Sequence, residues 1–307
     1  VLIDAKKRLL KSDPPALVHK SRIDLIEVGN IRDDFDKLAN CDWIVEAVVE
    51  RLDIKKDLYK RLNEVINPNC VVTSNTSTIP ISLLVEDMPE DFQKRFAITH
   101  YFNPVRYMRL LELVRGANTD EKIMDRLADY NDRVMGKGVV RCNDTPGFLG
   151  NRVGVFALQV GMDEASRNKL TVEEADALMG RPMGIPKTGV FGLYDLIGID
   201  LMSDVVNTLG DILPQDDLFH EVGTLNNPVM PLIREMIQNG FTGDKGEGGF
   251  YRIDNNTNCA VELTNGEIRP RQKNLPVSAQ KAADAQAVGD ETLTIMINGS
   301  DLSLIHI

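Results

Sequence analysis

Two ionisable residues twelve positions apart, His100 and Glu112, have the types and setting for general acid–base chemistry. Apolar and aromatic residues over 96–102 predict a short strand that stops at the Asn-Pro turn of 103–104, which places His100 at a strand end. Glu112 interrupts an apolar run, a second predicted strand over 110–114, where a lone carboxylate is costly without a partner. We therefore expect Glu112 to pair with His100, because this contact fixes the imidazole tautomer and leaves its other nitrogen free to take a proton.

The pair also has an ordinary interpretation. A histidine near a strand end is commonly a surface or core residue without chemistry, and a lone glutamate in an apolar run can face solvent on an edge strand. Both interpretations stay open on these two residues alone, because short motifs carry a risk of false matches.

The segment before this pair predicts a βαβ unit, the repeat of a parallel sheet. An apolar run rich in β-branched residues spans 43–49 and is typical of a strand buried in such a sheet. Apolar residues at helical spacing follow over 52–66, and the next apolar run is 70–74. Strand, helix and strand within about thirty residues make one βαβ unit.

Polar side chains follow each predicted strand at its carboxyl end, namely Glu50, Asn75, Ser77 and His100. Ligands of open parallel sheets bind beyond these ends. We therefore expect the four side chains to share one site. The alternative is that residues 75–78 cap a helix, a role that Ser and Thr favour, and both roles can hold together.

Residues 144–152 predict the start of a second domain. Asp144 or the threonine after it can cap a helix with Pro146 in its first turn, which would place Asn151 about a turn and a half into that helix. Helical spacing continues to residue 240 with breaks at glycines, so we expect a domain built of helices.

Composition narrows the class of protein. The chain has 307 residues, of which 43% are hydrophobic, and this suffices for the cores of two domains. A net charge of −11 and a pI near 5.0 argue against a general nucleic-acid or anionic-membrane surface. The four widely spaced cysteines lack metal-ligand spacing, so we expect no metal and a reducing compartment, the cytoplasm. No apolar run reaches the about 18 residues that span a membrane.

Short motifs, taken in chain order, resemble those of the 3-hydroxyacyl-CoA dehydrogenase family. The most specific is His-Tyr-Phe-Asn-Pro at 100–104 followed by Leu-Glu-Leu-Val at 111–114, which resembles the family's catalytic signature. The resemblance covers residues 13–251. The other motifs are V-E-A-V-V-E-R-L-D-I-K (45–55), N-T-S (75–77), D-T-P-G-F-L-G-N-R (144–152), M-G-I-P (183–186), D-L-I-G-I-D (195–200) and K-G-E-G-G-F-Y (245–251).

The resemblance implies an α/β fold: an incomplete Rossmann-type parallel-sheet domain, its first βαβ unit missing, followed by an all-α dehydrogenase C-terminal domain. It implies NAD-dependent oxidation of a 3-hydroxyacyl-CoA to the 3-oxoacyl-CoA in fatty-acid β-oxidation, with a homodimer through the helical domain. Segment 13–30 is most similar to the bacterial multidomain enzymes that also carry a hydratase domain. The alternatives are a non-catalytic helical binding module and a dehydrogenase of another small hydroxy acid.

By the same resemblance four residues would be catalytic. His100 would take the hydroxyl proton and Glu112 would steady the imidazolium. Ser77 and Asn151 would hold the oxygen as it becomes a carbonyl. The residues that would contact the dinucleotide are Glu50, Lys55, Asn75, Ser77, Asn103 and Lys245. For the first two of these, a solvated helix start is the alternative.

We expect four parts along the chain. The dinucleotide-binding domain spans 1–143 and is truncated, because residues 1–11 resemble the middle of a helix with no capping residue ahead of it. The helical substrate and dimerisation domain spans 144–253, and 254–301 is expected to be an irregular linker towards a further domain. Residues 302–307 resemble a translated sequencing adapter and are expected to be an artefact.

The chain as written is predicted to bind NAD weakly and to aggregate. It contains no Gly-x-Gly-x-x-Gly after a strand, the loop whose backbone approaches a pyrophosphate at a helix N-terminus. The missing strands would also leave an open sheet edge. Calorimetry should detect micromolar NAD affinity only after an upstream segment of about 30 or more residues restores the strand, helix and strand. Micromolar affinity of the chain alone would mean that the cofactor site is misplaced.

Overall fold

The computed structural model describes residues 2–180, 187–222 and 227–272, together with positions 275, 277, 280 and 281. The motif at 183–186 and the expected artefact at 302–307 lie outside the described residues. The chain divides into two compact units, residues 1–150 and 151–307, and each is described by itself.

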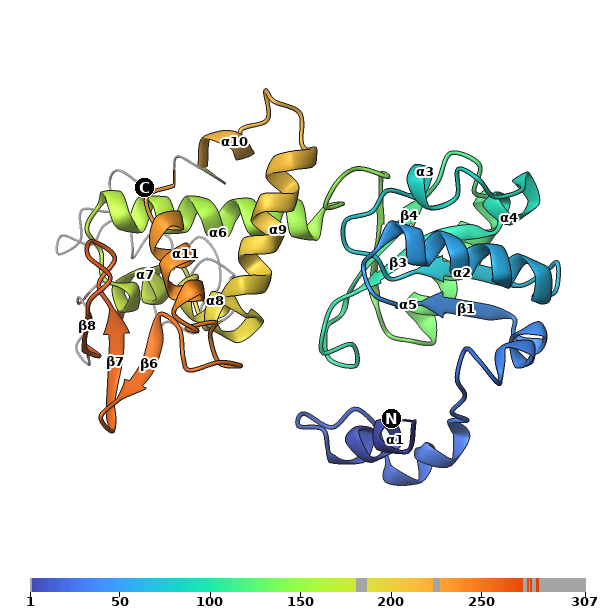
Figure 1. The fold of residues 1–307 in the computed structure, drawn as a ribbon, viewed down its shortest axis with the longest axis horizontal. Helices are drawn as coiled ribbons and strands as arrows, with labels where there is room; N and C mark the ends of the chain where they lie inside the picture. The colour runs from blue at the N-terminus through green and yellow to red at the C-terminus, as the bar shows by residue number, and fades with distance from the viewer. Residues whose placement is uncertain are drawn as a thin grey trace. The chain divides into compact units, whose positions relative to one another are not determined.

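The first unit is built on a five-stranded sheet with the order β1-β2-β3-β4-β5 (Figure 1). β1, β2 and β3 run parallel, as the βαβ pattern predicts, whereas β4 pairs antiparallel with β3, and β5 runs parallel to β4. The connection over 102–109 explains the reversal, because a crossover to a parallel neighbour needs about a dozen or more residues. The strands are β1 Trp43–Glu46, β2 Val71–Ser74, β3 Phe96–Tyr101, β4 Leu110–Arg115 and β5 Gly138–Cys142.

Helices cover both faces of this sheet. Phe96 and Ile98 of β3 pack in one core with α2 (Leu52–Val65), whereas Ala97 between them packs in a second core with α5 (Glu121–Arg133). This alternation is the two-residue period of a strand buried on both sides. The first face is completed by α3 Ile81–Leu84 and α4 Glu90–Lys94.

Three helical segments precede the sheet (Figure 1). The residues between the first and the second of them are hydrogen-bonded to the loop after β3. Arg106 of that loop donates hydrogen bonds from Nη1 to the carbonyls of Pro15 (2.8 Å) and Leu17 (3.0 Å). The hydroxyl of Tyr107 also donates to the carbonyl of Pro15, at 2.9 Å. The three segments are α1 Leu2–Lys11, η1 Lys20–Leu25 and η2 Phe35–Asn40.

The second unit is helical and also contains a small antiparallel sheet (Figure 1). Met162, Phe191, Val206 and Ile233 come from four different helices and share one core with Phe250. Within the described residues no helix is long and apolar enough to cross a membrane. The elements are α6 Gly150–Arg167, α7 Val172–Leu178, α8 Phe191–Ile197, α9 Ile199–Ile212, α10 Phe219–Val222, α11 Met230–Gln238, β6 Tyr251–Asp254, β7 Thr257–Val261 and β8 Ile268–Pro270.

The helix expected from Pro146 begins later than predicted. α6 starts at Gly150, so Asn151 is its second residue and does not lie a turn and a half into it. Gly147 and Phe148 have positive φ angles of 72° and 49°, which an α-helix cannot contain. The proline therefore belongs to a turn that leads into the helix.

The domain boundary expected at 143/144 is displaced for a related reason. The first unit continues to Gly150. Asp144, expected as a cap of the new helix, instead accepts two backbone N–H bonds at the start of α3. The N–H groups of Leu149 and Gly150 donate to Glu112 of β4, so the turn before α6 is bonded to the sheet of the first unit.

The expected irregular linker is wrong over 254–270. This stretch completes β6 and forms β7 and β8, and Val261 of β7 is fully buried in the core of the second unit. Arg269 of β8 pairs with the carboxylate of Glu173 in α7 at 2.6 Å. The polar composition was misleading for two reasons. A strand with one solvent face alternates polar and apolar residues. The polar Asn-Asn pair at 255–256 forms the hairpin turn, and both residues have positive φ angles.

Candidate active site

His100 and Glu112 face each other across the antiparallel pair of β3 and β4. The register makes them direct neighbours, and His100 Nδ1 lies 2.6 Å from Glu112 Oε2. His100 is 5% exposed and Glu112 is fully buried. The side-chain contact expected from the sequence is thus present, and it gives the buried carboxylate a donor that its apolar strand cannot supply.

The other oxygen of Glu112 is held by the backbone. Oε1 accepts hydrogen bonds from the N–H groups of Leu149 (2.8 Å) and Gly150 (2.6 Å). Burial raises the pKa of Glu112, but the hydrogen bonds from His100 and from these two N–H groups outweigh burial and hold the pKa below its ordinary value. Glu112 is therefore ionised at neutral pH. Because an ionised carboxylate only accepts, Nδ1 of His100 carries the ring proton.

Ser77 completes a chain of three side chains. Its Oγ lies 3.1 Å from His100 Nε2, and in a neutral ring with its proton on Nδ1 this nitrogen accepts the hydrogen bond of the hydroxyl. The rings of Phe102 and Phe148 lie beside the imidazole, with centroids 4.6 and 5.9 Å away. These apolar walls limit water around the ring and strengthen the polar contacts inside. The result is one imidazole nitrogen of fixed orientation that is able to act as a general base.

Glu50 organises the loop that carries Ser77. Its carboxylate accepts hydrogen bonds from the hydroxyl of Thr76, the backbone N–H of Ser77 (3.1 Å) and the hydroxyl of Thr78 (3.3 Å). Burial raises the pKa of Glu50, but the Thr76 hydroxyl and the Lys55 ammonium outweigh burial and lower it. An ionised carboxylate therefore holds the backbone of this loop in place.

Lys55, for which a cofactor contact was expected, is buried between two carboxylates. Its side chain is 1% exposed, and Nζ lies 2.8 and 3.0 Å from the two oxygens of Glu46 and 3.2 Å from Glu50. Glu46 also accepts hydrogen bonds from the hydroxyls of Tyr59 (2.6 Å) and Ser74 (2.7 Å). Burial and the charge of Glu46 raise the pKa of Tyr59, which therefore remains a neutral donor. The cluster connects the core under β1 and β2 to the loop that Glu50 holds.

Several groups of the site were not predicted from the sequence. Glu46 interrupts an apolar run as Glu112 does, so the same signal would have found it. The N–H groups of Leu149 and Gly150 leave no side-chain signal. Cys142 Sγ lies 3.8 Å from Glu112 Oε1, and burial and that carboxylate raise the pKa of the thiol to about 11. The thiol is a neutral neighbour of the pair and not a nucleophile.

The other predicted residues fall in three places. Asn75 Oδ1 accepts the backbone N–H of the last β3 residue at 2.9 Å, which links the ends of β2 and β3. Asn103 is exposed in the loop after β3, and its side chain makes no hydrogen bond within the described residues. Asn151 and Lys245 belong to the second unit, where Lys245 Nζ lies 2.6 Å from Asp200 Oδ1.

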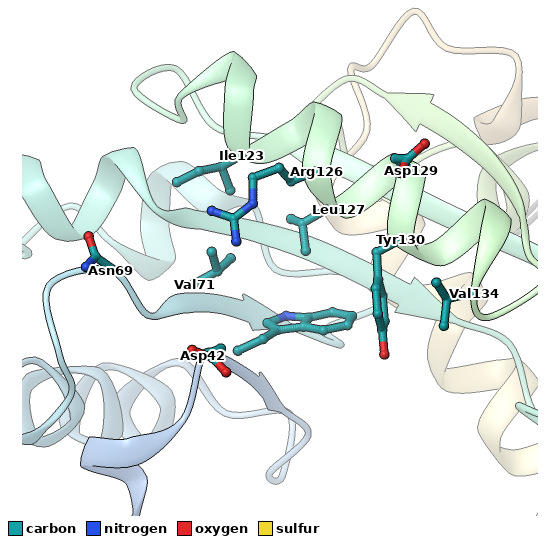
Figure 2. A pocket seen from close by; sticks show the side chains of 10 residues that line it. Asp42, Asn69, Val71, Ile123, Arg126, Leu127, Asp129, Tyr130 and Val134 are labelled. Carbon is teal, nitrogen blue, oxygen red and sulfur yellow. The ribbon is translucent and has the colours of Figure 1, made fainter.

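A separate hollow of about 640 Å³ lies beside α5, with side chains from α5 and the first two strands (Figure 2). Trp43 and Tyr130 meet edge to face in it, with ring centroids 5.8 Å apart. Among the described residues, no hydrogen bond or ion pair joins its charged residues Asp42, Arg126 and Asp129 to a nucleophile or an imidazole. None of the predicted site residues lines this hollow, so the candidate chemistry belongs to the strand ends.

A mostly parallel sheet with polar groups at its strand ends, followed by a helical unit, is typical of dehydrogenases that bind a dinucleotide. Residues 5–145 match the 3-hydroxyacyl-CoA dehydrogenase NAD binding domain, and residues 147–253 match the 3-hydroxyacyl-CoA dehydrogenase C-terminal domain. The chain belongs to the 3-hydroxyacyl-CoA dehydrogenase family. The family and the fold class expected from the sequence are thereby confirmed.

Relatives support this assignment at the level of sequence and structure. A fatty acid oxidation complex trifunctional enzyme of Rickettsia felis is 40% identical over 249 residues, which cover 81% of this chain and 34% of that protein. A protein named as a 3-hydroxyacyl-CoA dehydrogenase of Deinococcus radiodurans is 38% identical over 246 residues, 80% of this chain and 69% of that one. The crystal structure of M. tuberculosis FadB2 has a TM-score of 0.68 at 28% identity and covers 82% of this chain and 87% of that one. The chain thus spans about a third of the length of the trifunctional relative.

We predict that Lys55→Met destabilises the first unit by about 3–5 kcal/mol, because removing one partner of a buried ion pair leaves the other charge uncompensated. Urea unfolding followed by the fluorescence of Trp43, the single tryptophan, measures this cost in the first unit. Lys56→Met is the matched control one residue along α2. Its ammonium pairs with the half-exposed Glu86 and Asp87, so its loss should cost no more than about 1 kcal/mol. Equal costs for the two variants would contradict the prediction.

Proposed function

We propose that this protein oxidises a 3-hydroxyacyl-CoA to the 3-oxoacyl-CoA with NAD, as a step of fatty-acid β-oxidation. The observation that carries the proposal is the hydrogen-bonded chain from Ser77 through His100 to the buried Glu112. A relative named for a fatty acid oxidation complex supports the pathway. A non-catalytic binding module is disfavoured, because a carboxylate buried beside an imidazole costs desolvation that binding alone does not require.

His100 is the general base of the proposed reaction. In the neutral ring its Nε2 takes the proton of the substrate's C3 hydroxyl, and the electron pair of that O–H bond forms the new carbonyl. NAD, when bound, supplies the acceptor for the hydride that leaves C3. Glu112 stabilises the imidazolium that results, because its buried negative charge lies 2.6 Å from Nδ1.

Ser77 and Asn151 would hold the reacting oxygen. The Ser77 hydroxyl lies 3.1 Å from Nε2, so it can donate to an oxygen that is giving its proton to the same nitrogen. Asn151, the second residue of α6, would supply an amide N–H. Donors of this kind stabilise the negative charge that develops on the oxygen before the carbonyl is complete.

The strand ends fit the part of NAD that contains the ribose and the nicotinamide. Glu50 is ionised and its side chain is 40% exposed, so it can accept a hydrogen bond from a ribose hydroxyl. Asn75 has an amide nitrogen that makes no hydrogen bond within the described residues and can serve as a donor. Lys55 acts through Glu50 by compensating its charge. Asn103 and Lys245 are the further proposed contacts. The sequence holds no glycine-rich loop for the pyrophosphate.

We predict that His100→Gln lowers kcat by about 10²–10⁴-fold with NAD and 3-hydroxybutyryl-CoA. Glutamine keeps a polar side chain beside Glu112 but cannot take the proton. The measurement is NADH absorbance with the full-length enzyme, and thermal unfolding shows whether the variant is folded.

His19→Gln is the control for this variant. His19 is an exposed histidine of the same unit, so this substitution should leave kcat within about twofold. A loss of less than about fivefold in His100→Gln would refute the assignment of the base.

Glu112→Gln should lower kcat and alter the pH–rate profile, because it removes the charge beside the ring.

We also propose a homodimer that buries an apolar face of the helical unit. Leu196 of α8, Leu201 of α9 and Leu218 before α10 are 59%, 50% and 63% exposed, and exposed large apolar side chains can mark a protein–protein contact. Light scattering should give twice the 34.2 kDa of the chain at micromolar concentration. Leu201→Lys should shift it towards the monomer, whereas a monomer in the unchanged protein would refute the proposal.

The proposed location is the cytoplasm. Cys41, Cys70, Cys142 and Cys259 are all free thiols. Cysteines stay reduced in a cytosolic compartment and tend to form disulfides in secreted proteins. The four free thiols support the proposal.

A further inference from the structure

Three charged side chains form a group at the end of β1, beside the proposed active site. Lys55 Nζ is shared by two carboxylates, at 2.8 Å from Glu46 and 3.2 Å from Glu50. Within the described residues no other cation pairs with either carboxylate. The net charge of Glu46, Glu50 and Lys55, which we call the Glu46 cluster, is therefore −1.

The surroundings of the Glu46 cluster do not cancel this charge. Arg51 follows Glu50 in the chain, but it pairs with Asp53 at 2.6 Å, so these two residues add no net charge. His100 is neutral when it acts as a base, and Glu112 beside it adds a further negative charge. Taken together, these side chains give the strand ends a net negative charge.

The charge of Glu46 acts from the interior. The side chains of Glu46 and Lys55 are each 1% exposed, so water and salt screen their charges poorly. Glu50 is the surface member of the cluster, with a side chain that is 40% exposed. The cluster therefore presents its excess negative charge at Glu50, where a ligand can meet it.

Glu50 is bonded directly to the loop that would face the substrate. Its carboxylate accepts the backbone N–H of Ser77 at 3.1 Å, and the Ser77 hydroxyl lies 3.1 Å from His100 Nε2. A hydride acceptor must lie against the carbon that the hydride leaves, and this carbon carries the hydroxyl that His100 deprotonates. A dinucleotide that reacts here therefore has its nicotinamide ring next to the loop that Glu50 holds.

The nicotinamide ring changes its charge in the proposed reaction. It is a pyridinium cation in NAD, and it becomes neutral when it gains the hydride, which is a proton with two electrons. The positive charge reappears on His100, which has taken the hydroxyl proton and lies beside the negative Glu112. A negative charge next to the ring therefore stabilises the oxidised cofactor and has no such effect on the reduced one.

We propose that the Glu46 cluster sets the preference of the site between oxidised and reduced cofactor, by favouring the cationic ring over the neutral one. Glu46 takes part without touching the ligand, because its buried charge keeps Lys55 from neutralising Glu50. The inference rests on the proposed function, because that function supplies the dinucleotide. It gives Glu46, a buried residue, a role in cofactor selection.

The experiment is calorimetry of NAD and of NADH with the full-length enzyme in the absence of substrate. Glu46→Gln should weaken NAD binding relative to NADH binding by about fivefold or more, because the cluster then has no net charge. Tyr59→Phe is the matched control. It removes a hydrogen bond to Glu46 and keeps every charge, so the ratio of the two dissociation constants should stay within about twofold.

Glu50→Gln keeps the test valid if Glu46→Gln does not fold. It removes the same charge at a more exposed position, and it also removes the proposed contact with a ribose hydroxyl, which NAD and NADH share. Both dissociation constants should therefore increase, that of NAD by about fivefold more. Glu86→Gln is the control for this variant, because Glu86 is a half-exposed carboxylate that pairs with Lys56. It should leave the ratio unchanged.

Each outcome decides the proposal. A shift of the ratio towards NADH in every folded variant of Glu46 and Glu50, with both controls unchanged, supports it. An equal loss of both affinities would overturn it, because such a loss means that the residues only hold the structure. An unchanged ratio, or the same shift in Tyr59→Phe or Glu86→Gln, would overturn it as well.

The proposed function fails in a different way. If the unchanged enzyme binds neither dinucleotide, the proposed function is overturned together with this inference. If the inference alone is wrong, the unchanged enzyme still binds both dinucleotides and is still active in the assay used for His100→Gln.

Discussion

The buried negative charge of Glu112 is the constraint on which the first unit depends. A carboxylate in a strand core is tolerated only when several donors replace the water that it has lost. Here the donors come from separate parts of the chain, His100 on β3 and the N–H groups of Leu149 and Gly150 at the start of α6. The charge is compensated only when β3, β4 and this turn are all in place. A Cβ on Gly150 would lie 2.7 Å from the Phe102 ring, so the approach of this turn requires glycine.

Glu46 on β1 is a second buried carboxylate whose charge is compensated by several donors, and these donors lead to the loop of Ser77. Its donors are Lys55, Tyr59 and Ser74, and Lys55 then reaches Glu50 at the surface. The alternation of negative, positive and negative charge runs from the core to the loop of Ser77. Ser77 is thus held through Glu50, which Lys55 connects to the buried Glu46, and His100 is held by the buried Glu112. The distance between hydroxyl and imidazole is therefore set from both sides.

Much of this arrangement was predictable because its signals are local. Apolar runs of strand length gave the strands β1 to β4, and the desolvation of a lone carboxylate gave the contact between Glu112 and His100. The start of α6 was not predictable in this way, because a proline such as Pro146 suits a turn as well as the first turn of a helix. Only the positive φ angles of Gly147 and Phe148 exclude the helix there. The small sheet was missed because its strands are only three to five residues long and carry several polar residues.

The turn at the end of the first unit depends on the same charge. Glu112 holds the imidazole of His100 and the backbone of Leu149 and Gly150, so one carboxylate positions both the proposed base and this turn. The folded pKa of Glu112 lies below its ordinary value. Its stabilising contribution is therefore complete above that ordinary value and is lost as the pH falls through the folded value. Acid would then release the imidazole and the backbone of Leu149 and Gly150 together, because both are held by the same negative charge.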